Sequence, residues 1–416
     1  MTDANTDPAV VRDEAGWSLG DLEPAASRHN WTRSGVTVHD GSIVVGTADG
    51  RVRSYDPDGE CRWEAGGEEY AVSLAADDEL VVVGGRGPTG RLRVLSRETG
   101  EQQWTYLTAE DVGSPARETF FAQPYVVDVA IAGDRIVVVA RRYERDGDVQ
   151  HWSSVVYGFD RAGELQWSYD ARASPIAADV ADGRVAVAYN RCPANHDHDH
   201  GLVVLETETG TELTTWDPGT PGERRVGDVA ITDERIAVAS HGDKHGYLLE
   251  DDGAEAWCVD LASECETDDE TLYAYPNHVA VVDGTAIFVT GNTYAAETRD
   301  PDGRHPNEHT AVAVDLESGE TIWSHDVRGF ARCLSADDGL VAVPSAQNFR
   351  ERDADTHAVH LLEAGTGPLE TRSIEGISTA VSLSGDRLAV IEEPVEYHDE
   401  GVTRGAYRLH TWRLEG

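Results

Sequence analysis

The sequence predicts an all-β fold, an eight-bladed β-propeller of four-stranded antiparallel blades that is closed by its own N-terminal strand. Three observations lead to this prediction. A glycine followed four residues later by a tryptophan recurs along the chain, most clearly at Gly319 and Trp323. Short β-branched runs recur in a fixed order between turns rich in Asp and Gly, which is typical of strands. No segment has the pattern of a long amphipathic helix, so the repeated units indicate a radial or stacked β architecture.

Each Gly–Trp pair is predicted to mark the turn between the third and fourth strands of a blade. Glycine permits the turn conformation, and the indole buries a large flat surface against the neighbouring blade while its N–H bonds a backbone acceptor. The other pairs are Gly59 and Trp63, Gly100 and Trp104, Gly163 and Trp167, Gly253 and Trp257, and, with two extra residues, Gly210 and Trp216.

The first three strands of each blade are predicted from their β-branched runs. The innermost strands are expected at 35–38, 71–74, 126–129, 176–180, 226–229, 278–281, 331–334 and 380–383. Second strands begin at Ser42, Glu79, Asp134, Gly183, Glu234, Thr285, Gly339 and Asp386. Third strands are expected at 52–55, 92–95, 155–159, 202–205, 247–249, 311–314, 358–361 and 407–412.

The last blade lacks a fourth strand, because the chain ends at Leu414-Glu415-Gly416. A matching strand with a tryptophan, Ala15 to Leu19 around Trp17, precedes the first inner strand instead. A closed ring leaves no unpaired strand edge, so we expect the N-terminal strand to complete the last blade. The predicted organisation is a flexible tail over 1–12 and one propeller domain over 13–416.

The phrase Ala313-x-Asp315-x-x-Ser318-Gly319-x-x-x-Trp323 resembles the tryptophan-docking repeat of propellers of the pyrroloquinoline quinone (PQQ) type. The resemblance covers nearly the whole chain and implies the propeller fold. It also implies comparison with quinoprotein dehydrogenases, which are exported, carry an adjacent cysteine pair and a catalytic Asp, and bind calcium beside the quinone. The five cysteines here (61, 192, 258, 265 and 333) are scattered, and no residue matches the catalytic Asp. We therefore predict no catalytic residue and no bound PQQ.

The resemblance extends to the eight-bladed lipoprotein that helps to assemble bacterial outer membranes. The lipobox of that lipoprotein has no counterpart here. The resemblance therefore predicts the fold and does not predict that assembly role.

The composition indicates a salt-adapted cytosol, such as that of a halophilic archaeon. The 416 residues carry 77 acidic and 34 basic side chains, a formal charge of −43, and Lys244 is the one lysine. Such a charge keeps a protein soluble at high salt and destabilises it in dilute solution by self-repulsion. Scattered cysteines, the absence of a signal-like N-terminus and the absence of a membrane-spanning apolar run predict a cytoplasmic location. A monomer without nucleic-acid or membrane partners is expected.

The blade order sorts the connections onto two faces, one with short turns and one with long loops. Long loops on a rigid scaffold are where binding usually occurs. The predicted long loops are 107–124, 141–153, 189–200, 241–245, 259–276, 292–309, 345–356 and 392–405. We call this the loop-rich face. Many of the histidines and arginines fall on it, so it is the predicted binding surface.

Six residues near the starts of inner strands are the candidate ligand-binding set at the mouth of the central channel. We expect them to bind an anionic group, such as a phosphate, a carboxylate or an acidic segment of a partner. The alternative is that the arginines pair with the abundant carboxylates. The set is Arg33, Arg172, Arg225, Arg328, Arg332 and His278.

The string Asn195 to His200 carries alternating histidines. In an extended segment His196, His198 and His200 would point the same way and present three imidazoles to a divalent metal such as zinc or copper. The alternative is a solvated loop that binds metal adventitiously, and no metal site is predicted.

The function predicted from these features is a non-catalytic binding or protein-interaction propeller. Its partner is expected to be a protein or a small anionic ligand. The alternatives are an enzyme that acts on a small anionic or sugar-like ligand at the channel mouth, and a quinoprotein-like oxidoreductase.

Overall fold

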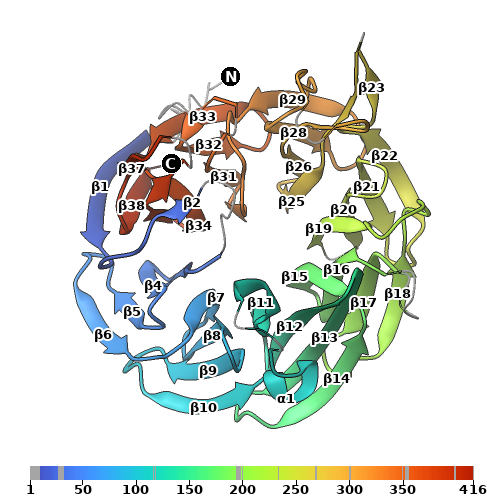
Figure 1. Cartoon of the computed structure of the whole chain (residues 1–416). Helices are drawn as coiled ribbons and strands as arrows, with labels where there is room; N and C mark the ends of the chain where they lie inside the picture. Colours follow the sequence, from blue (N-terminus) through green and yellow to red (C-terminus); the bar gives the residue numbers. More distant parts are fainter. Residues whose placement is uncertain are drawn as a thin grey trace, which may run out of the picture.

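Figure 1 shows a computed structural model of the chain, in which antiparallel sheets are arranged in a ring. The structure describes residues 10–26, 32–115, 117, 119–193, 198, 200–232, 234–267, 269–298, 301–348, 350–351, 356–397 and 400–415. The molecule is a β-propeller, and its core lies between neighbouring sheets. In one core cluster, for example, Val82 and Leu92 from one sheet pack with Val138 and Tyr157 from the next.

The first half of the ring consists of strands that follow one another in chain order, each paired antiparallel with the next. One sheet contains β3 (Gly35–His39), β4 (Ser42–Gly46), β5 (Val52–Tyr55) and β6 (Cys61–Ala65). The next set contains β7 (Tyr70–Ala76), β8 (Leu80–Arg86), β9 (Arg91–Ser96) and β10 (Gln102–Leu107). A bridge from β8 joins it to β11 (Tyr125–Ala132), β12 (Arg135–Asp146), β13 (Val149–Asp160) and β14 (Leu165–Ala171).

The second half of the ring repeats this order. The sheets contain β15 (Ser174–Ala181), β16 (Arg184–Arg191), β17 (Leu202–Glu206) and β18 (Glu212–Trp216); then β19 (Val226–Ile231), β20 (Arg235–Ser240), β21 (His245–Glu250) and β22 (Glu255–Asp260). They continue with β25 (Pro276–Val282), β26 (Thr285–Thr290), β28 (Thr310–Asp315) and β29 (Thr321–Asp326), and with β30 (Ser335–Asp337), β31 (Leu340–Ser345), β32 (Ala358–Glu363) and β33 (Gly367–Ser373).

Small elements lie in the long connections. They are a sheet of β2 (Ala25–Ala26), β36 (Val395–Glu396) and β37 (Thr403–Arg404), and a sheet of β23 (Cys265–Glu266), β24 (Thr271–Tyr273) and β27 (Tyr294–Ala295). The connection after β10 contains the short helix α1 (Ala109–Val112) and the 3₁₀ turn η1 (Phe120–Ala122).

The ring closes through the N-terminal strand. Strand β1 (Val10–Ser18) pairs antiparallel with β38 (Arg408–Glu415), which pairs with β35 (Arg387–Glu393) and then β34 (Ile377–Ser384). Trp17 lies opposite Leu409, so the pairing inferred from the sequence is present. Strand β1 begins at Val10, inside the 1–12 range expected to be a tail, because the ladder with β38 extends to Glu415. Residues 1–9 lie outside the described residues.

Tryptophans of the outer strands join neighbouring sheets. The Trp167 indole donates its N–H to the Thr207 carbonyl at 2.8 Å, and a Cβ built on Gly210 would lie 2.5 Å from the Trp167 ring. The same indole donation occurs from Trp63 to Arg97, Trp104 to Arg161, Trp257 to Leu316, and Trp323 to Ala364. The turn glycine therefore creates the space that receives the ring of the preceding blade, and the indole N–H bonds the next blade's turn.

Trp216, whose spacing from Gly210 is longer, packs differently. Its ring lies 4.8 Å from the Tyr247 ring, and a Cβ on the following turn glycine, Gly253, would meet Thr214 instead of an indole. On the N-terminal strand, Trp17 lies against Gly59 and stacks on Tyr55, with ring centroids 5.8 Å apart. The N-terminal strand thus docks as the outer strands of other blades do.

Two local predictions were wrong. Residues 141–153 form the end of a long β12–β13 hairpin, in which Tyr143 and Trp152 are cross-strand partners with ring centroids 4.7 Å apart. Aromatic cross-strand pairs stabilise such a ladder although the flanking sequence is polar. The inner strand expected at 331–334 is also displaced to Ser335, because the Ala331 carbonyl accepts a hydrogen bond from His278 of the preceding sheet.

No helix among the described residues is both long and apolar enough to cross a membrane.

Candidate functional site

The inner strands enclose a central cavity of about 500 Å³. Its wall includes Ser73 on β7, Asp128 on β11, Asp179 on β15, Asp228 on β19 and His278 on β25. Ser73, Asp128, Asp228 and His278 occupy the same position, directly after the β-bulge of their strands. Asp179 lies two residues nearer the β15–β16 turn. The cavity is therefore lined by polar side chains at two neighbouring positions of the repeat.

Polar side chains of the inner strands also join most of these strands to the next one. The Asp128 carboxylate accepts the Val129 N–H at 2.9 Å and, on the neighbouring strand, the Ala178 N–H at 3.3 Å. The Ser73 hydroxyl donates a hydrogen bond to the Val126 carbonyl. In the remaining bridges a backbone N–H of one strand donates to a side chain of the neighbouring strand: Ile231 to Asp179, Val279 to Asp228, Leu383 to Ser335 and Val38 to Ser382. The primary role of these groups is to hold adjacent blades together.

Burial raises the pKa of Asp128 to about 7. The backbone N–H donors oppose this shift, and the charges of Asp179 and Asp228 add to it. Burial likewise raises the pKa of Asp179. A carboxylate that loses water is disfavoured in its charged form unless hydrogen bonds compensate. Asp128 is therefore only partly ionised near neutral pH.

Two of the six predicted channel-mouth residues, Arg332 and His278, line this cavity. Arg332 donates to the Thr32 hydroxyl at 2.8 Å. His278 lies 3.2 Å from the Asp228 carboxylate and 3.1 Å from the Ala331 carbonyl, so it spans two sheets. The cavity therefore combines a cation near its loop-rich end with polar groups further along the axis.

The other four predicted residues lie elsewhere. Arg33 pairs with the buried Glu393, Arg225 pairs with Asp217 at 2.8 Å, and Arg328 pairs with Glu351 at 3.7 Å. Arg172 is exposed and lines a separate cavity of about 540 Å³ together with Asp170 and His198. The structure does not bring Arg172, Arg225 or Arg328 to Arg332 and His278. Burial lowers the pKa of Arg332, and Arg33, although paired with Glu393, lies close enough for its charge to contribute to this shift.

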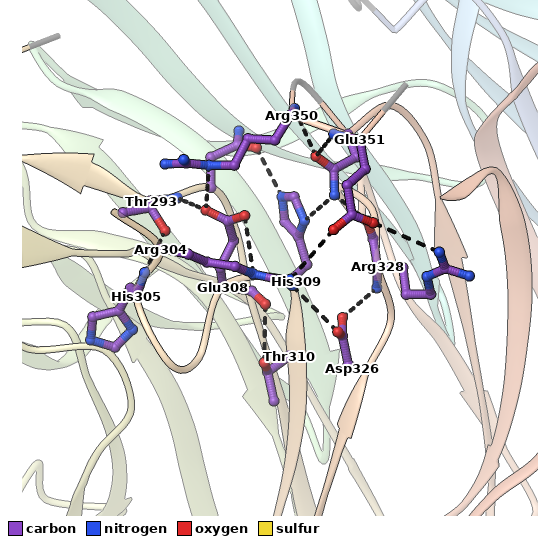
Figure 2. A network of polar contacts seen from close by, with 12 residues as sticks. Thr293, Arg304, His305, Glu308, His309, Thr310, Asp326, Arg328, Arg350 and Glu351 are labelled. Carbon is purple, nitrogen blue, oxygen red and sulfur yellow. Dashed lines mark hydrogen bonds and ion pairs between the residues drawn. The ribbon is translucent and has the colours of Figure 1, made fainter. Parts of the chain in front are cut away.

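Figure 2 shows the polar network in which Arg328 pairs with Glu351. The buried Glu308 accepts the Thr293 N–H at 2.9 Å and lies 3.4 Å from both Arg304 and Arg350. Arg304 also reaches Asp326 and Glu351, and Glu351 pairs with Arg328. Because a buried carboxylate needs such partners, this network ties the loop before β28 to the loop after β31.

Histidines of the loop-rich face contribute less charge than the sequence predicted. Burial lowers the pKa of His241 to about 3 and the pKa of His309 to about 4. His357 is fully buried and lies 2.7 Å from the Tyr397 hydroxyl. Burial also lowers the pKa of His357, so these three imidazoles add less positive charge to the face than the sequence suggested.

A cluster of arginines that sequence reasoning missed surrounds Tyr125, at the loop-rich end of the cavity. Tyr125 begins β11 and lies opposite Arg141 on β12 and Arg86 on β8. The Arg86 and Arg141 guanidinium carbons lie 4.7 and 5.4 Å from the Tyr125 ring centroid. Tyr125 and Arg332 both line the cavity. We call Arg86, Arg141 and Arg332 the arginine cluster; no spacing in the sequence links them, because they come from three different repeats.

A second group forms a patch between the fifth and sixth inner strands, counted from β3. Tyr273, Tyr275 and Tyr294 have ring centroids 5.2 to 5.8 Å apart. The Arg224 guanidinium lies 4.6 Å from the Tyr275 ring, and the Lys244 ammonium lies 5.1 Å from the Tyr273 ring. These five residues are the tyrosine patch. The density of tyrosines between 273 and 294 was a signal in the sequence that we did not use.

The predicted histidine metal site is only partly described, since His196 lies outside the described residues. His198 stacks on Tyr189 with centroids 4.5 Å apart and bonds the His200 carbonyl at 2.9 Å. Within the described ranges no group of three His, Cys, Asp or Glu side chains could hold a metal ion. The three imidazoles at 196–200 stay a candidate set for a divalent metal, beside the alternative of a solvated loop.

The described cavity does not fit a quinone with an adjacent metal ion. Asp128, Asp179 and Asp228 each use both carboxylate oxygens to accept backbone N–H groups. The lining residues include Cys333 and no tryptophan, because the repeat tryptophans lie on the outer strands. The carboxylate oxygens that could bind a metal are therefore occupied by backbone N–H groups, and the tryptophans that could stack on a quinone lie on the outer strands.

A ring of four-stranded sheets, docked by outer-strand tryptophans and bridged by inner-strand polar groups, defines a β-propeller of PQQ-like repeats. Residues 9–158 and 152–402 match the family model described as outer membrane protein assembly factor BamB. The chain belongs to this family. No curated protein matches the sequence.

Solved structures share the fold at low sequence identity. BamB from Moraxella catarrhalis is 16% identical with a TM-score of 0.57, covering 97% of each chain. Quinohemoprotein alcohol dehydrogenase from Comamonas testosteroni is 12% identical with a TM-score of 0.61, covering 99% of this chain and 77% of that one. A europium-containing methanol dehydrogenase is 10% identical with a TM-score of 0.58, covering 98% and 93%. Likeness at this identity shows the fold alone.

Proposed function

We propose that this chain is a non-catalytic, eight-bladed binding propeller that holds a protein partner on its loop-rich face. The observation that carries the proposal is the tyrosine patch. Tyr294 is 38% exposed, and two further tyrosines and two cations surround it. Tyrosine and arginine are the residues enriched in the energetically important centres of protein interfaces.

The charges of the tyrosine patch indicate the chemistry of the partner. Arg224 has no carboxylate partner within the described part of the chain and stacks on Tyr275, and Lys244 donates to the Gly242 carbonyl at 2.9 Å. In a chain with a formal charge of −43, two cations on aromatic rings form a local site for negative charge. An acidic segment that also carries apolar side chains would satisfy both the cations and the rings.

The rigidity of the surrounding loops supports a binding role. Tyr273 and Tyr294 lie on paired strands of the small sheet β23–β24–β27, so their spacing is set by backbone hydrogen bonds. The Glu308 network fixes the loop that contains β27 at its other end. A preformed aromatic surface loses little side-chain entropy when a partner binds.

The proposal is tested by quantitative affinity capture from a lysate that keeps multimolar salt. The bait proteins are wild type, a Tyr294→Ser/Arg224→Gln double variant, and an Ile322→Ser control on the exposed side of β29. We expect one stoichiometric partner with wild type and the control, and at least a tenfold loss with the double variant. A partner recovered equally by all three baits, or none with any bait, overturns the proposal.

A further inference from the structure

The arginine cluster forms a second site that is independent of the tyrosine patch. We infer that Arg86, Arg141 and Arg332, gathered around Tyr125 at the loop-rich end of the central cavity, bind a small dianionic oxyanion of the phosphate type.

The first step is the convergence of the three side chains. Backbone pairing puts Arg86 and Arg141 on opposite sides of Tyr125, since β11 hydrogen-bonds to β8 and to β12 at that residue. Arg332 comes from the irregular segment before β30 and shares the cavity wall with Tyr125. The displaced start of β30 matters here, because a regular strand from 331 would place alternate side chains on opposite faces of the sheet.

The second step is the surroundings of the cluster. Arg86 is only 8% exposed, and its guanidinium carbon lies 3.7 Å above the Phe120 ring. Arg141 lies 5.1 Å from the Trp152 ring and hydrogen-bonds the Ser174 hydroxyl, a neutral group. Aromatic faces hold a guanidinium in place without neutralising its charge. The cluster therefore presents positive charge in a partly desolvated, preorganised setting.

The third step is electrostatic. Burial is the main cause that lowers the pKa of Arg86 to about 9; Tyr125 opposes this shift, and the charges of Arg141 and Arg332 contribute to it. Arg86 is therefore cationic near neutral pH, and the positive charges of the cluster repel one another. A bound dianion would remove this repulsion, and guanidinium groups bind phosphate oxygens through short, paired hydrogen bonds.

The fourth step is access and polarity along the cavity. Thr32 lines the cavity beside Arg332, and its hydroxyl accepts a hydrogen bond from Arg332. The nearest carboxyl group on β11, Asp128, lies three residues beyond Tyr125 and is occupied by backbone donors. Glu393, another carboxylate whose charge reaches Arg332, is paired with Arg33. At the loop-rich end the cavity wall therefore offers Arg332 and Thr32, with Arg86 and Arg141 beside Tyr125, and the carboxyl groups lie further in.

The test is isothermal titration with inorganic phosphate at pH 7.5, in potassium chloride adjusted to constant ionic strength. Wild type should bind one phosphate saturably, and Arg141→Gln should weaken binding at least tenfold. The control is Arg413→Gln. This change removes an exposed arginine of β38 that pairs with Asp386, and the variant should bind phosphate as wild type does. Circular dichroism spectra and melting temperatures identify any variant that fails to fold, in which case Arg332→Gln replaces it.

Two further arms complete the test. Malonate in place of phosphate distinguishes a dicarboxylate from a phosphate ligand; equal or tighter malonate binding overturns the phosphate assignment. The Tyr294→Ser/Arg224→Gln variant should bind phosphate normally, which separates this site from the proposed partner surface. Non-saturable heats, or equal affinity in wild type and Arg141→Gln, would show that the cluster is only a structural stack of cations on aromatic rings.

Discussion

At the scale of single residues, the repeat works through pairs that lie far apart in the sequence. Gly210 has a φ of +67° in the turn after β17, and the ring that fills the space above it is that of Trp167, from the preceding blade. Glycine at this position therefore has two roles: it adopts the positive φ of the turn, and its lack of a Cβ leaves room for the indole. A turn glycine without an indole above it serves only the first purpose.

This difference predicts the outcome of two matched substitutions. Gly183→Ala, at a φ of +74° with nothing within 4 Å of the added Cβ, should cost about 1–2 kcal/mol for the left-handed conformation alone. Gly210→Ala adds a clash at 2.5 Å with a ring held by its bond to Thr207, and should cost a further ~1–3 kcal/mol. Denaturant unfolding at constant high salt measures both losses. Equal losses would show that the indole moves aside freely.

At the scale of elements, neighbouring blades are joined both at their outer strands and at their inner strands. Outer strands are joined by the indoles, and inner strands by polar side chains such as Asp128 and Asp179. A strand is usually stabilised within its own sheet, but here the carboxylates of Asp128 and Asp179 also accept a hydrogen bond from the next inner strand. Because burial raises the pKa of both carboxyl groups, these two junctions depend on pH.

The sign of this dependence follows from the raised pKa of Asp128. The folded protein keeps the Asp128 proton up to a pH of about 7, whereas the unfolded chain loses it near ~3.9. The folded state binds more protons in that window, so this contribution to stability is complete below about pH 4 and is lost as pH rises towards 7. Between pH 5 and 8, wild type should lose more unfolding free energy than Asp128→Asn. The difference should grow by about 1.4 kcal/mol for each step of pH over which only the folded state holds the proton.

The measurement is the free energy of unfolding of wild type and Asp128→Asn across this pH range. Asparagine offers one acceptor oxygen instead of two, which shifts its curve by a constant amount and leaves the slope to report the titration. Asp58→Asn, at an exposed position in the turn before β6, is the control and should follow wild type. Parallel curves for wild type and Asp128→Asn would refute the assignment.

At the scale of the whole molecule, the ring is held closed by the pairing of β1 with β38. Strand β38 pairs with β35 on one edge, and β1 covers its other edge, which would otherwise be unpaired among the described residues. It also brings Trp17 onto Gly59 and Tyr55 of the adjacent sheet. The N-terminal strand thus supplies both an outer strand and a docking indole.

Removal of residues 1–18 should therefore lower the melting temperature and promote self-association through the exposed β38 edge. A variant that lacks only residues 1–9 retains the whole of β1 and is the control. Melting followed by circular dichroism, together with light scattering on a sizing column at high salt, measures both effects. A truncated protein that stays monomeric with an unchanged melting temperature would show that the ring does not need this strand for closure.

The sequence predicted the strands well and the site poorly, for different physical reasons. Strand runs such as 202–205 and 311–314 agree with β17 and β28 to within one residue, because β-branched alternation and turn glycines are local signals. The hairpin at 141–153 was missed because its stability comes from the contact between Tyr143 and Trp152 across two strands. Local composition there resembles a loop.

By itself, the sequence determined the all-β class, the repeat, the closing strand at Trp17 and the acidic character, since each depends on patterns that adjacent residues carry. Only the tertiary structure decided which cations meet. Arg33, Arg225 and Arg328 are neutralised by carboxylates, whereas Arg86, Arg141 and Arg332 gather around Tyr125. Charge interactions act through space between residues of different repeats, and no spacing along the chain records that distance.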